Sequence, residues 1–210
     1  MDFNRIRSCG IVPMIKIDEA ENALPLANAL LEGGIDNIEI TFRTAAAKAS
    51  MLNISKALPE MVVGAGTVIN LSQYNEAKAA GAVFVVTPGL NVEVVNAAKA
   101  DGIAILPGVI TPTEIMAGIS LGLNVFKFFP AESFGGLNTV KALCGPFGQI
   151  SFLPTGGISQ DNAAEYLKFN KILAVGGSWV APDKLIAEKN FKEITKRSKE
   201  AMEIVKAARL

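Results

Sequence analysis

The amino-acid sequence predicts a (β/α)8 barrel, in which a closed parallel sheet is surrounded by helices. The main observation is a unit of about 20 to 27 residues, a short β-branched segment followed by a helix-sized stretch, that recurs along the chain. The 210 residues are fewer than the roughly 250 typical of this fold, so we expect short loops. An open doubly wound sheet of fewer strands is the alternative, but no Gly-x-Gly-x-x-Gly motif follows the first strand to support a dinucleotide site.

Eight strands are predicted from runs of β-branched and aromatic residues. In chain order they are Ile11–Ile17, Asn37–Arg43, Met61–Thr67, Val83–Pro88, Ala104–Val109, Asn124–Phe129, Ser151–Thr155 and Ile172–Gly177. Several of the intervening helices end in glycine, which suits the left-handed backbone that closes a helix. These glycines are Gly33, Gly34, Gly81, Gly102 and Gly122.

The helices carry start signals of different strength. The clearest is the run Thr111-Pro112-Thr113-Glu114, where a capping hydroxyl, a proline at the first helical position and a glutamate at the third coincide. Asp18, Asn91 and Ser159 are weaker capping candidates. Pro25 lies inside the first predicted helix and indicates a kink or a late start there.

Composition narrows the class of protein. Half of the residues are apolar, enough for one sizeable core, so we expect a single domain over residues 1–210. Twenty basic and twenty acidic residues give no net charge, so we expect neither nucleic acid nor a membrane surface as a partner. No secretory signal opens the sequence and its apolar runs are too short to span a membrane, which predicts a cytoplasmic protein.

Two residue types bear on the chemistry. The sequence contains no histidine, which excludes most Ser or Cys triads and most catalytic zinc sites. Cys9 and Cys144 are far apart and have no neighbouring metal-ligand partners, so we interpret them as bystander thiols. The chemistry is therefore expected from lysine, arginine, carboxylates, hydroxyls and backbone amides.

Polar residues late in the strands are the candidate site residues, because barrel enzymes act at the carboxyl ends of their strands. In the second strand, alternation points Glu39, Thr41 and Arg43 into the barrel and the intervening apolar residues outward. A structural salt bridge between Glu39 and Arg43 is the alternative to the chemical role that we favour.

The sixth predicted strand carries Lys127, whose amine is expected to point into the barrel interior. Alternation points Val125, Lys127 and Phe129 inward and the two intervening phenylalanines outward. A nucleophilic lysine must lose its proton, which burial and nearby cations favour and a nearby carboxylate opposes. The balance of these effects stays open, and an idle Lys127 paired with a carboxylate is the alternative.

Glycine pairs end the seventh and eighth strands, in Pro154-Thr155-Gly156-Gly157 and Val175-Gly176-Gly177-Ser178. Barrels commonly bind phosphate with these two loops, using glycine amides at a helix N-terminus. Two such pairs, each beside a hydroxyl, predict a phosphate site. Thr67 and Pro88 lie in two other glycine-containing segments. These segments could have a functional role, or their glycines could serve only close packing and turns.

Taken together, these segments resemble the 2-keto-3-deoxy-6-phosphogluconate/4-hydroxy-2-oxoglutarate aldolases over almost the whole chain. The matching stretches are Gly33-Gly34, Glu39-Ile40-Thr41-Phe42-Arg43-Thr44, Gly64-Ala65-Gly66-Thr67-Val68, Thr87-Pro88-Gly89, Pro107-Gly108-Val109, Phe126-Lys127-Phe128-Phe129-Pro130-Ala131-Glu132, Gly145-Pro146-Phe147, Pro154-Thr155-Gly156-Gly157-Ile158 and Gly176-Gly177-Ser178-Trp179.

The resemblance implies a class I aldolase that uses no metal or other cofactor and assembles as a homotrimer. Lys127 would form a Schiff base with the ketone of a 2-oxo acid, and Glu39 would move protons. Substrate phosphate or carboxylate groups would meet Arg43, Thr155, Gly156, Gly157, Gly177 and Ser178. Thr67, Pro88 and Phe129 would line the pocket.

Lys16, late in the first predicted strand, is the least settled candidate. It is a possible phosphate contact, otherwise an exposed strand-end lysine, and the chief rival to Lys127 as nucleophile. Two other function classes stay open: a phosphate-binding barrel isomerase or epimerase, which would not need Lys127, and an idle barrel that serves as a binding module.

Overall fold

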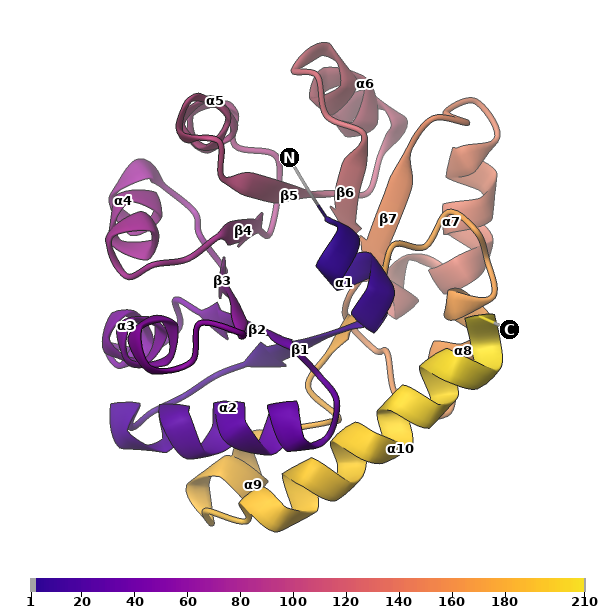
Figure 1. The fold of residues 1–210 in the computed structure, drawn as a ribbon. Helices are drawn as coiled ribbons and strands as arrows, with labels where there is room; N and C mark the ends of the chain where they lie inside the picture. The colour runs from indigo at the N-terminus through magenta and orange to yellow at the C-terminus, as the bar shows by residue number, and fades with distance from the viewer. Residues whose placement is uncertain (1–2, 210) are drawn as a thin grey trace.

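Eight parallel strands form the centre of the molecule, and each is followed by at least one helix (Figure 1). The structure is a computed structural model that describes residues 3–209. The strands are β1 (Ile11–Ile15), β2 (Asn37–Thr41), β3 (Val62–Gly66), β4 (Phe84–Thr87), β5 (Ala104–Val109), β6 (Val125–Phe128), β7 (Ser151–Pro154) and β8 (Val175–Gly177). The helices are α1 (Asn4–Cys9), α2 (Ala23–Glu32), α3 (Ala47–Ala57), α4 (Leu71–Ala79), α5 (Val92–Asp101), α6 (Pro112–Ser120), α7 (Gly136–Cys144), α8 (Ala163–Leu167), α9 (Asp183–Ala187) and α10 (Phe191–Arg209), with 3-10 turns η1 (Ala20–Asn22) and η2 (Glu132–Phe134).

The strands follow one another around a nearly closed barrel. Neighbours in the sheet run β7-β6-β5-β4-β3-β2-β1-β8, so β8 pairs with β1. The ring closes between β7 and β8 through isolated bridges, Phe152 with Ile172 and Thr155 with Gly176. The predicted (β/α)8 barrel is therefore confirmed.

All eight predicted strands are found, seven of them with shorter ends. β5 has the predicted bounds, whereas β2 ends at Thr41 because the amide of Arg43 turns back to the carbonyl of Thr41, at 2.8 Å. β8 begins at Val175 rather than Ile172, since Ile172 makes only the isolated bridge to Phe152. The strands therefore stop where the loops that carry the polar residues begin.

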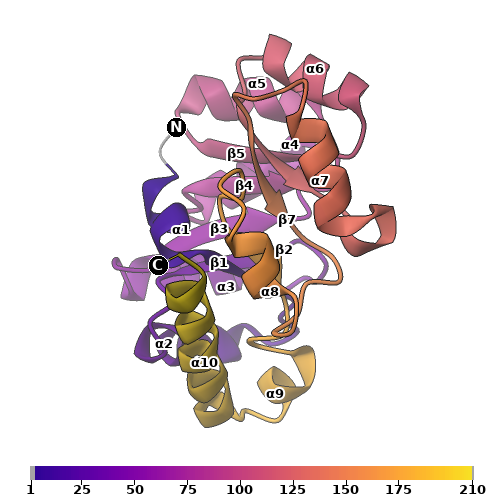
Figure 2. The same cartoon turned by 90° about the vertical axis from the view of Figure 1, so that its right-hand side faces the viewer.

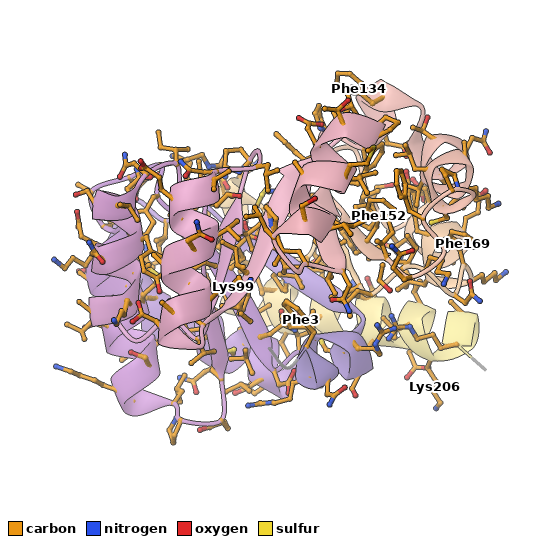
Figure 3. All side chains as sticks on the ribbon, turned by 90° about the horizontal axis from the view of Figure 1, so that it is seen from above. Phe3, Lys99, Phe134, Phe152, Phe169 and Lys206 are labelled. Carbon is orange, nitrogen blue, oxygen red and sulfur yellow. The ribbon has the colours of Figure 1, made fainter. Side chains whose placement is uncertain are left out.

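Two apolar layers hold the barrel together. The larger lies between sheet and helices and includes Phe126 and Phe128, whose rings meet Phe152 at centroid distances of 6.4 and 6.0 Å. Figure 3 shows Phe152 among packed side chains and Phe134 at the margin of the molecule. The smaller layer fills the barrel interior and includes Val125. Phe126 and Phe128 thus point outward and Val125 inward, as alternation predicts.

Helix α1, which the sequence did not reveal, lies across the ring of strands (Figure 1). Its Ile6 joins the interior layer and is 3% exposed. The next strand starts directly after α1, so the helix covers the amino ends of the strands. The barrel is therefore closed by apolar packing at the end opposite to the candidate site.

The helix-end signals have mixed outcomes. Thr111 and Glu114 form the predicted capping box, and Asn91 caps α5 by accepting the amide of Val94. The predictions for Asp18 and Ser159 are wrong: the Asp18 carboxylate binds Lys16, and α8 begins only at Ala163. The sequence signal fails there because a capping side chain can find other partners.

The glycine and proline signals at the helix boundaries are confirmed except at Gly33, whose φ of −82° is right-handed because the next residue, Gly34, takes the left-handed position. Four of the helix-closing glycines have positive φ, between 71° and 91°: Gly34, Gly81, Gly102 and Gly122. Pro25 lies in the first turn of α2, which starts late, after η1. A proline is tolerated there because the first-turn amides have no partner within the helix.

Helix α10 completes the outer layer by lying against α2 and α8, as Figures 1 and 2 show. Arg209 near its end donates to the carbonyls of Arg7 and Leu173. In residues 3–209, none of the helices has the length and apolar character needed to cross a membrane.

Candidate active site at the carboxyl ends of the strands

Lys127 lies inside the barrel, late in β6. Its side chain is 3% exposed, and its Nζ lies 4.8 Å from the centroid of the Phe129 ring. The strand register sets it beside Gly108 of β5 and Leu153 of β7. Among residues 3–209, no carboxylate forms an ion pair with Lys127. The structure therefore does not support the alternative in which Lys127 is an idle lysine paired with a carboxylate.

Glu39 is a fully buried carboxyl in the middle of β2. Within the described part of the chain, neither of its oxygens has a hydrogen-bond partner, and no ion pair joins it to Arg43. The structural salt bridge considered from the sequence is therefore absent there. A buried carboxyl without a partner is costly and is characteristic of functional positions.

Burial raises the pKa of the Glu39 carboxyl above its usual range, and the positive charges of Lys127 and then Arg43 act against that rise. Lys127 is thus near enough to influence Glu39 although their strands are well separated in the ring. A carboxyl whose pKa lies closer to neutral can both accept and return a proton. An amine and a proton carrier therefore share the barrel interior.

Gly66 makes the position of Glu39 possible. A Cβ at Gly66 would lie 2.0 Å from Oε1 of Glu39, well inside van der Waals contact. Gly66 is the last residue of β3 and pairs with Thr41 of β2. We did not single it out as a site residue from the sequence, although the register of two neighbouring strands carries the signal.

Arg43 follows β2 and is held by Thr41. The Thr41 hydroxyl donates to the carbonyl of Ile15 at 2.9 Å and accepts from Nε of Arg43 at 3.1 Å. Thr41 is fully buried, whereas Arg43 is exposed. The Thr41 hydroxyl thus holds the guanidinium near the end of β2, close enough for its charge to act on Glu39.

Thr67 and Pro88 follow the ends of β3 and β4. Thr67 has a φ of 57°, an unusual backbone for a β-branched residue, and strain of this kind collects at functional sites. Pro88 is half-buried, and its carbonyl lies so close to Gly108 that a Cβ there would approach it to 2.2 Å. Both residues stand at the carboxyl edge, beside the strands of the candidate site.

The two glycine-pair loops lie next to each other. Thr155 bridges to Gly176, and a Cβ at Gly176 would lie 2.4 Å from the Thr155 hydroxyl oxygen. That oxygen is buried and has no hydrogen-bond partner among residues 3–209. Gly156 and Gly157 have φ of 98° and 81°, in the range that favours glycine.

Gly177 and Ser178 complete the second of these loops. Gly177 is buried against the Trp179 ring, where a Cβ would approach within 2.2 Å, and Ser178 is exposed. The bridge between Thr155 and Gly176 brings this loop beside the first glycine pair. The two loops thus form one continuous stretch of the barrel edge.

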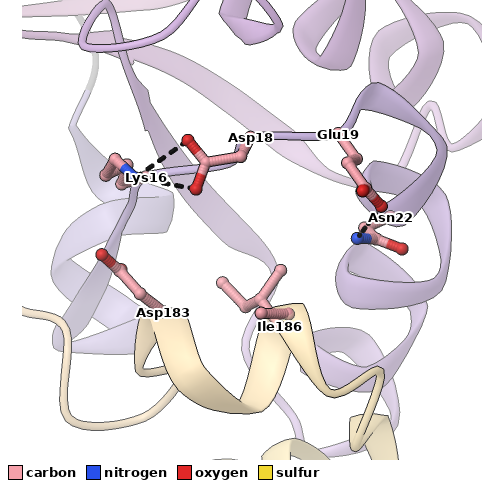
Figure 4. Close-up of a pocket in the computed structure, with 7 residues that line it drawn as sticks. Lys16, Asp18, Glu19, Asn22, Asp183 and Ile186 are labelled. Carbon is pink, nitrogen blue, oxygen red and sulfur yellow. Dashed lines mark hydrogen bonds and ion pairs between the residues drawn. The ribbon is translucent and has the colours of Figure 1, made fainter.

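Lys16 stands apart from these loops in its contacts. Its Nζ lies 2.7 and 2.8 Å from the two carboxylate oxygens of Asp18 (Figure 4). It lines a pocket of about 100 Å³ with Asp18, Glu19, Asn22, Asp183, Ile186 and Ala187. An ion-paired, partly exposed amine is a poorer nucleophile than a buried one.

Comparison with known proteins connects this arrangement to an enzyme family. Residues 3–197 match the family model for KDPG and KHG aldolase, where KDPG is 2-keto-3-deoxy-6-phosphogluconate and KHG is 4-hydroxy-2-oxoglutarate. The KHG/KDPG aldolase of Escherichia coli K12 is 43% identical over 193 residues, 92% of this chain and 91% of that protein. The 2-dehydro-3-deoxy-phosphogluconate aldolase of Treponema pallidum is 40% identical over 203 residues, 97% of each chain.

Solved structures agree with these matches. The KDPG aldolase of Legionella pneumophila, with pyruvate captured as a covalent carbinolamine intermediate, superposes with a TM-score of 0.91 and 40% identity, covering 94% of this chain and 96% of that one. The aldolase of Zymomonas mobilis ZM4 with 3-phosphoglycerate gives a TM-score of 0.90 and 41% identity, covering 96% and 95%.

Proposed function

The chain belongs to the KDPG and KHG aldolase family, and from this premise we propose that it is a class I aldolase that splits KDPG into pyruvate and glyceraldehyde 3-phosphate. The observation that carries the proposal is the pair of buried groups in the barrel, the Lys127 amine and the Glu39 carboxyl. The covalent pyruvate adduct in the Legionella relative supports the same chemistry.

The reaction begins when the neutral amine of Lys127 adds to the C2 ketone of the substrate. The carbinolamine loses water and leaves an iminium ion. Glu39 takes the proton from the C4 hydroxyl, directly or through water, while the C3–C4 bond breaks and its electron pair moves into the iminium. The aldehyde departs, the enamine takes a proton at C3, and water hydrolyses the new iminium to release pyruvate and the free amine.

The remaining candidate residues divide between the two ends of the substrate. Thr67, Pro88 and Phe129 line the pocket around the reacting carbons. Arg43, Thr155, Gly156, Gly157, Gly177 and Ser178 bind its phosphate and carboxylate groups, for which positive-φ glycines and a guanidinium are suited. Lys16 contributes a phosphate contact at the rim, where it would exchange Asp18 for the ligand.

Borohydride reduction in the presence of pyruvate tests the nucleophile. We expect a mass increase on the peptide that contains Lys127, no labelling of Lys127→Met, and full labelling of Lys16→Met. Removing the nucleophile should lower kcat by about a thousandfold or more. Labelling at Lys16, or no labelling at all, would overturn the assignment.

A second substrate, KHG, is favoured by the double name of the Escherichia coli relative. It would be split into pyruvate and glyoxylate by the same steps. An assay that couples pyruvate release to lactate dehydrogenase, run with KDPG and KHG, measures the preference. The phosphate-binding loops predict a higher kcat/KM for KDPG, and a barrel without aldolase activity would release pyruvate from neither.

We also propose a homotrimer of single-domain chains in the cytoplasm. Large apolar side chains that are 49–59% exposed in the isolated chain support an assembly, among them Ile69, Val92, Met116 and Phe134. Sedimentation equilibrium should give three times the chain mass of 22.1 kDa. Cell fractionation tests the location.

A further inference from the structure

The loop that follows β6 carries Glu132, a carboxylate that the proposed reaction does not use. This loop is joined to the first glycine-pair loop by backbone hydrogen bonds. The amide of Ala131 donates to the carbonyl of Thr155 at 2.8 Å, and the amide of Glu132 donates to the carbonyl of Gly156 at 3.0 Å. The ladder between β6 and β7 therefore continues past both strands and reaches the glycines that would receive a phosphate.

The side chain of Glu132 covers Gly157 with its aliphatic part. A Cβ on Gly157 would lie 2.6 Å from Cβ and 2.5 Å from Cγ of Glu132. The carboxylate turns the other way, because a Cβ on Gly136 would lie 2.8 Å from Oε1 and 2.9 Å from the Tyr166 hydroxyl oxygen. The CH₂ groups thus face the glycine loop, and the negative charge faces α7 and α8.

Tyr166 of α8 holds the carboxylate in that direction. Its hydroxyl donates to Oε1 of Glu132, and its side chain is 2% exposed. Burial and then this hydrogen bond raise the pKa of Tyr166 far above the neutral range, so the hydroxyl stays a donor at every working pH. The glycine loop is also held by Asn162, whose amide donates to the carbonyl of Gly157 at 3.1 Å.

We propose that the Tyr166–Glu132 pair positions the site for a substrate phosphate: the hydroxyl keeps the Glu132 carboxylate away from the phosphate while its aliphatic part supports Gly157. The inference rests on the proposed aldolase function and names two positioning residues for phosphorylated substrates. A phosphate carries a charge of about −1.5 to −2 at neutral pH, so a carboxylate released beside Gly157 would repel it. KHG ends in a carboxylate of smaller charge on a shorter chain, so it would experience less of that repulsion.

Steady-state kinetics of three variants test the pair. For Tyr166→Phe, we expect KM for KDPG to rise about tenfold, because the released carboxylate repels the phosphate, and kcat to change less than about twofold. KM for KHG should change much less. Glu132→Gln keeps an acceptor for Tyr166 and removes the charge, so its kinetics should stay near those of the unmodified chain.

The double variant Tyr166→Phe with Glu132→Gln is the decisive one. If the freed charge causes the effect, removing it should restore most of the affinity for KDPG. Inorganic phosphate, as a competitive inhibitor, should show the same order of inhibition constants. If Tyr166→Phe does not fold, Glu132→Asp replaces it, since the exposed, shorter carboxylate cannot reach Tyr166 and KM for KDPG should again rise.

Tyr74→Phe is the matched control. Tyr74 is also a fully buried tyrosine whose hydroxyl donates to a carboxylate, Asp101 at 2.7 Å, but it belongs to α4 and its partner to α5. Its KM for both substrates should stay unchanged. Equal losses for KDPG and KHG, or no change in KM for KDPG, would overturn the proposal, whereas an unmodified chain that cleaves neither substrate would overturn the aldolase assignment itself.

Discussion

The buried carboxyl of Glu39 destabilises the fold that contains it. Because burial raises its pKa above the value in the unfolded chain, the folded state binds more protons than the unfolded state between those two values. The free energy of unfolding therefore falls as the pH rises through that interval. The loss is complete above the folded pKa and absent below the unfolded one.

Glu39→Gln should therefore stabilise the protein. We expect the free energy of unfolding to rise at pH 8 and to rise much less at pH 4, because burial opposes only the ionised form of the carboxyl. Urea denaturation at the two pH values measures it. Glu203→Gln, on the exposed face of α10, is the control, and a pH-independent effect of Glu39→Gln would contradict the prediction.

Gly66→Ala tests the packing of the same carboxyl. The added methyl group would overlap Oε1 of Glu39, so we expect kcat to fall about a hundredfold, as for loss of a general base. Borohydride trapping of pyruvate on Lys127 should continue. Gly148→Ala, where a Cβ meets nothing within 4 Å, should keep full activity. Loss of trapping in Gly66→Ala would mean that the barrel, and not the carboxyl alone, has been disturbed.

Single residues could be predicted from sequence where alternation within one strand defines their direction. This holds for the inward Lys127 and Glu39 and for the outward Phe126 and Phe128. The contact between Glu132 and Tyr166 could not be predicted, because the two residues are 34 positions apart and meet only when α8 packs beside the loop after β6.

At the scale of elements, predicted helix starts were confirmed where the capping side chain has its partners within the same turn. Thr111 and Glu114 satisfy each other within one turn, so the start of α6 follows from the sequence. The Asp18 carboxylate has a cation two residues away and binds it rather than a helix amide. Helix α1 was missed because six residues with two buried side chains form no clear helical period.

Thr111→Ala should lower the free energy of unfolding by about 1 kcal/mol, since it leaves the amide of Glu114 without its cap. Thr113→Ala, at an exposed position of the same turn, is the matched control and should change it by less than about 0.5 kcal/mol. Chemical denaturation at neutral pH compares them. Equal effects would show that the cap is not the cause.

At the scale of the whole molecule, the two ends of the barrel have separate tasks. The interior below Lys127 is filled by apolar side chains and closed by Ile6 of α1, whereas the loops with the other candidate site residues follow the opposite ends of the strands. In barrels of this kind, the amino end serves stability and the carboxyl end serves chemistry.

Ile6→Ala should therefore lower the free energy of unfolding by about 2–4 kcal/mol while kcat and KM stay within about twofold. Thermal unfolding and the pyruvate-release assay, run on the same preparation, separate the two effects. Leu71→Ala, at a side chain that is 39% exposed, should change stability much less. A fall in kcat for folded Ile6→Ala would contradict the separation.

The contact between β7 and β8, which we call the joint, is the weakest strand pairing in the ring. Every other pair of neighbouring strands is joined by a ladder, whereas these two meet only at isolated bridges, so they keep some of the character of edge strands inside a closed sheet. Few hydrogen bonds must break for this joint to open, and its amide hydrogens should exchange with solvent sooner than those of β2 and β3. The glycine pairs flank the joint, so the part of the barrel edge best suited to adjust around a ligand is also the part where the sheet is least continuous.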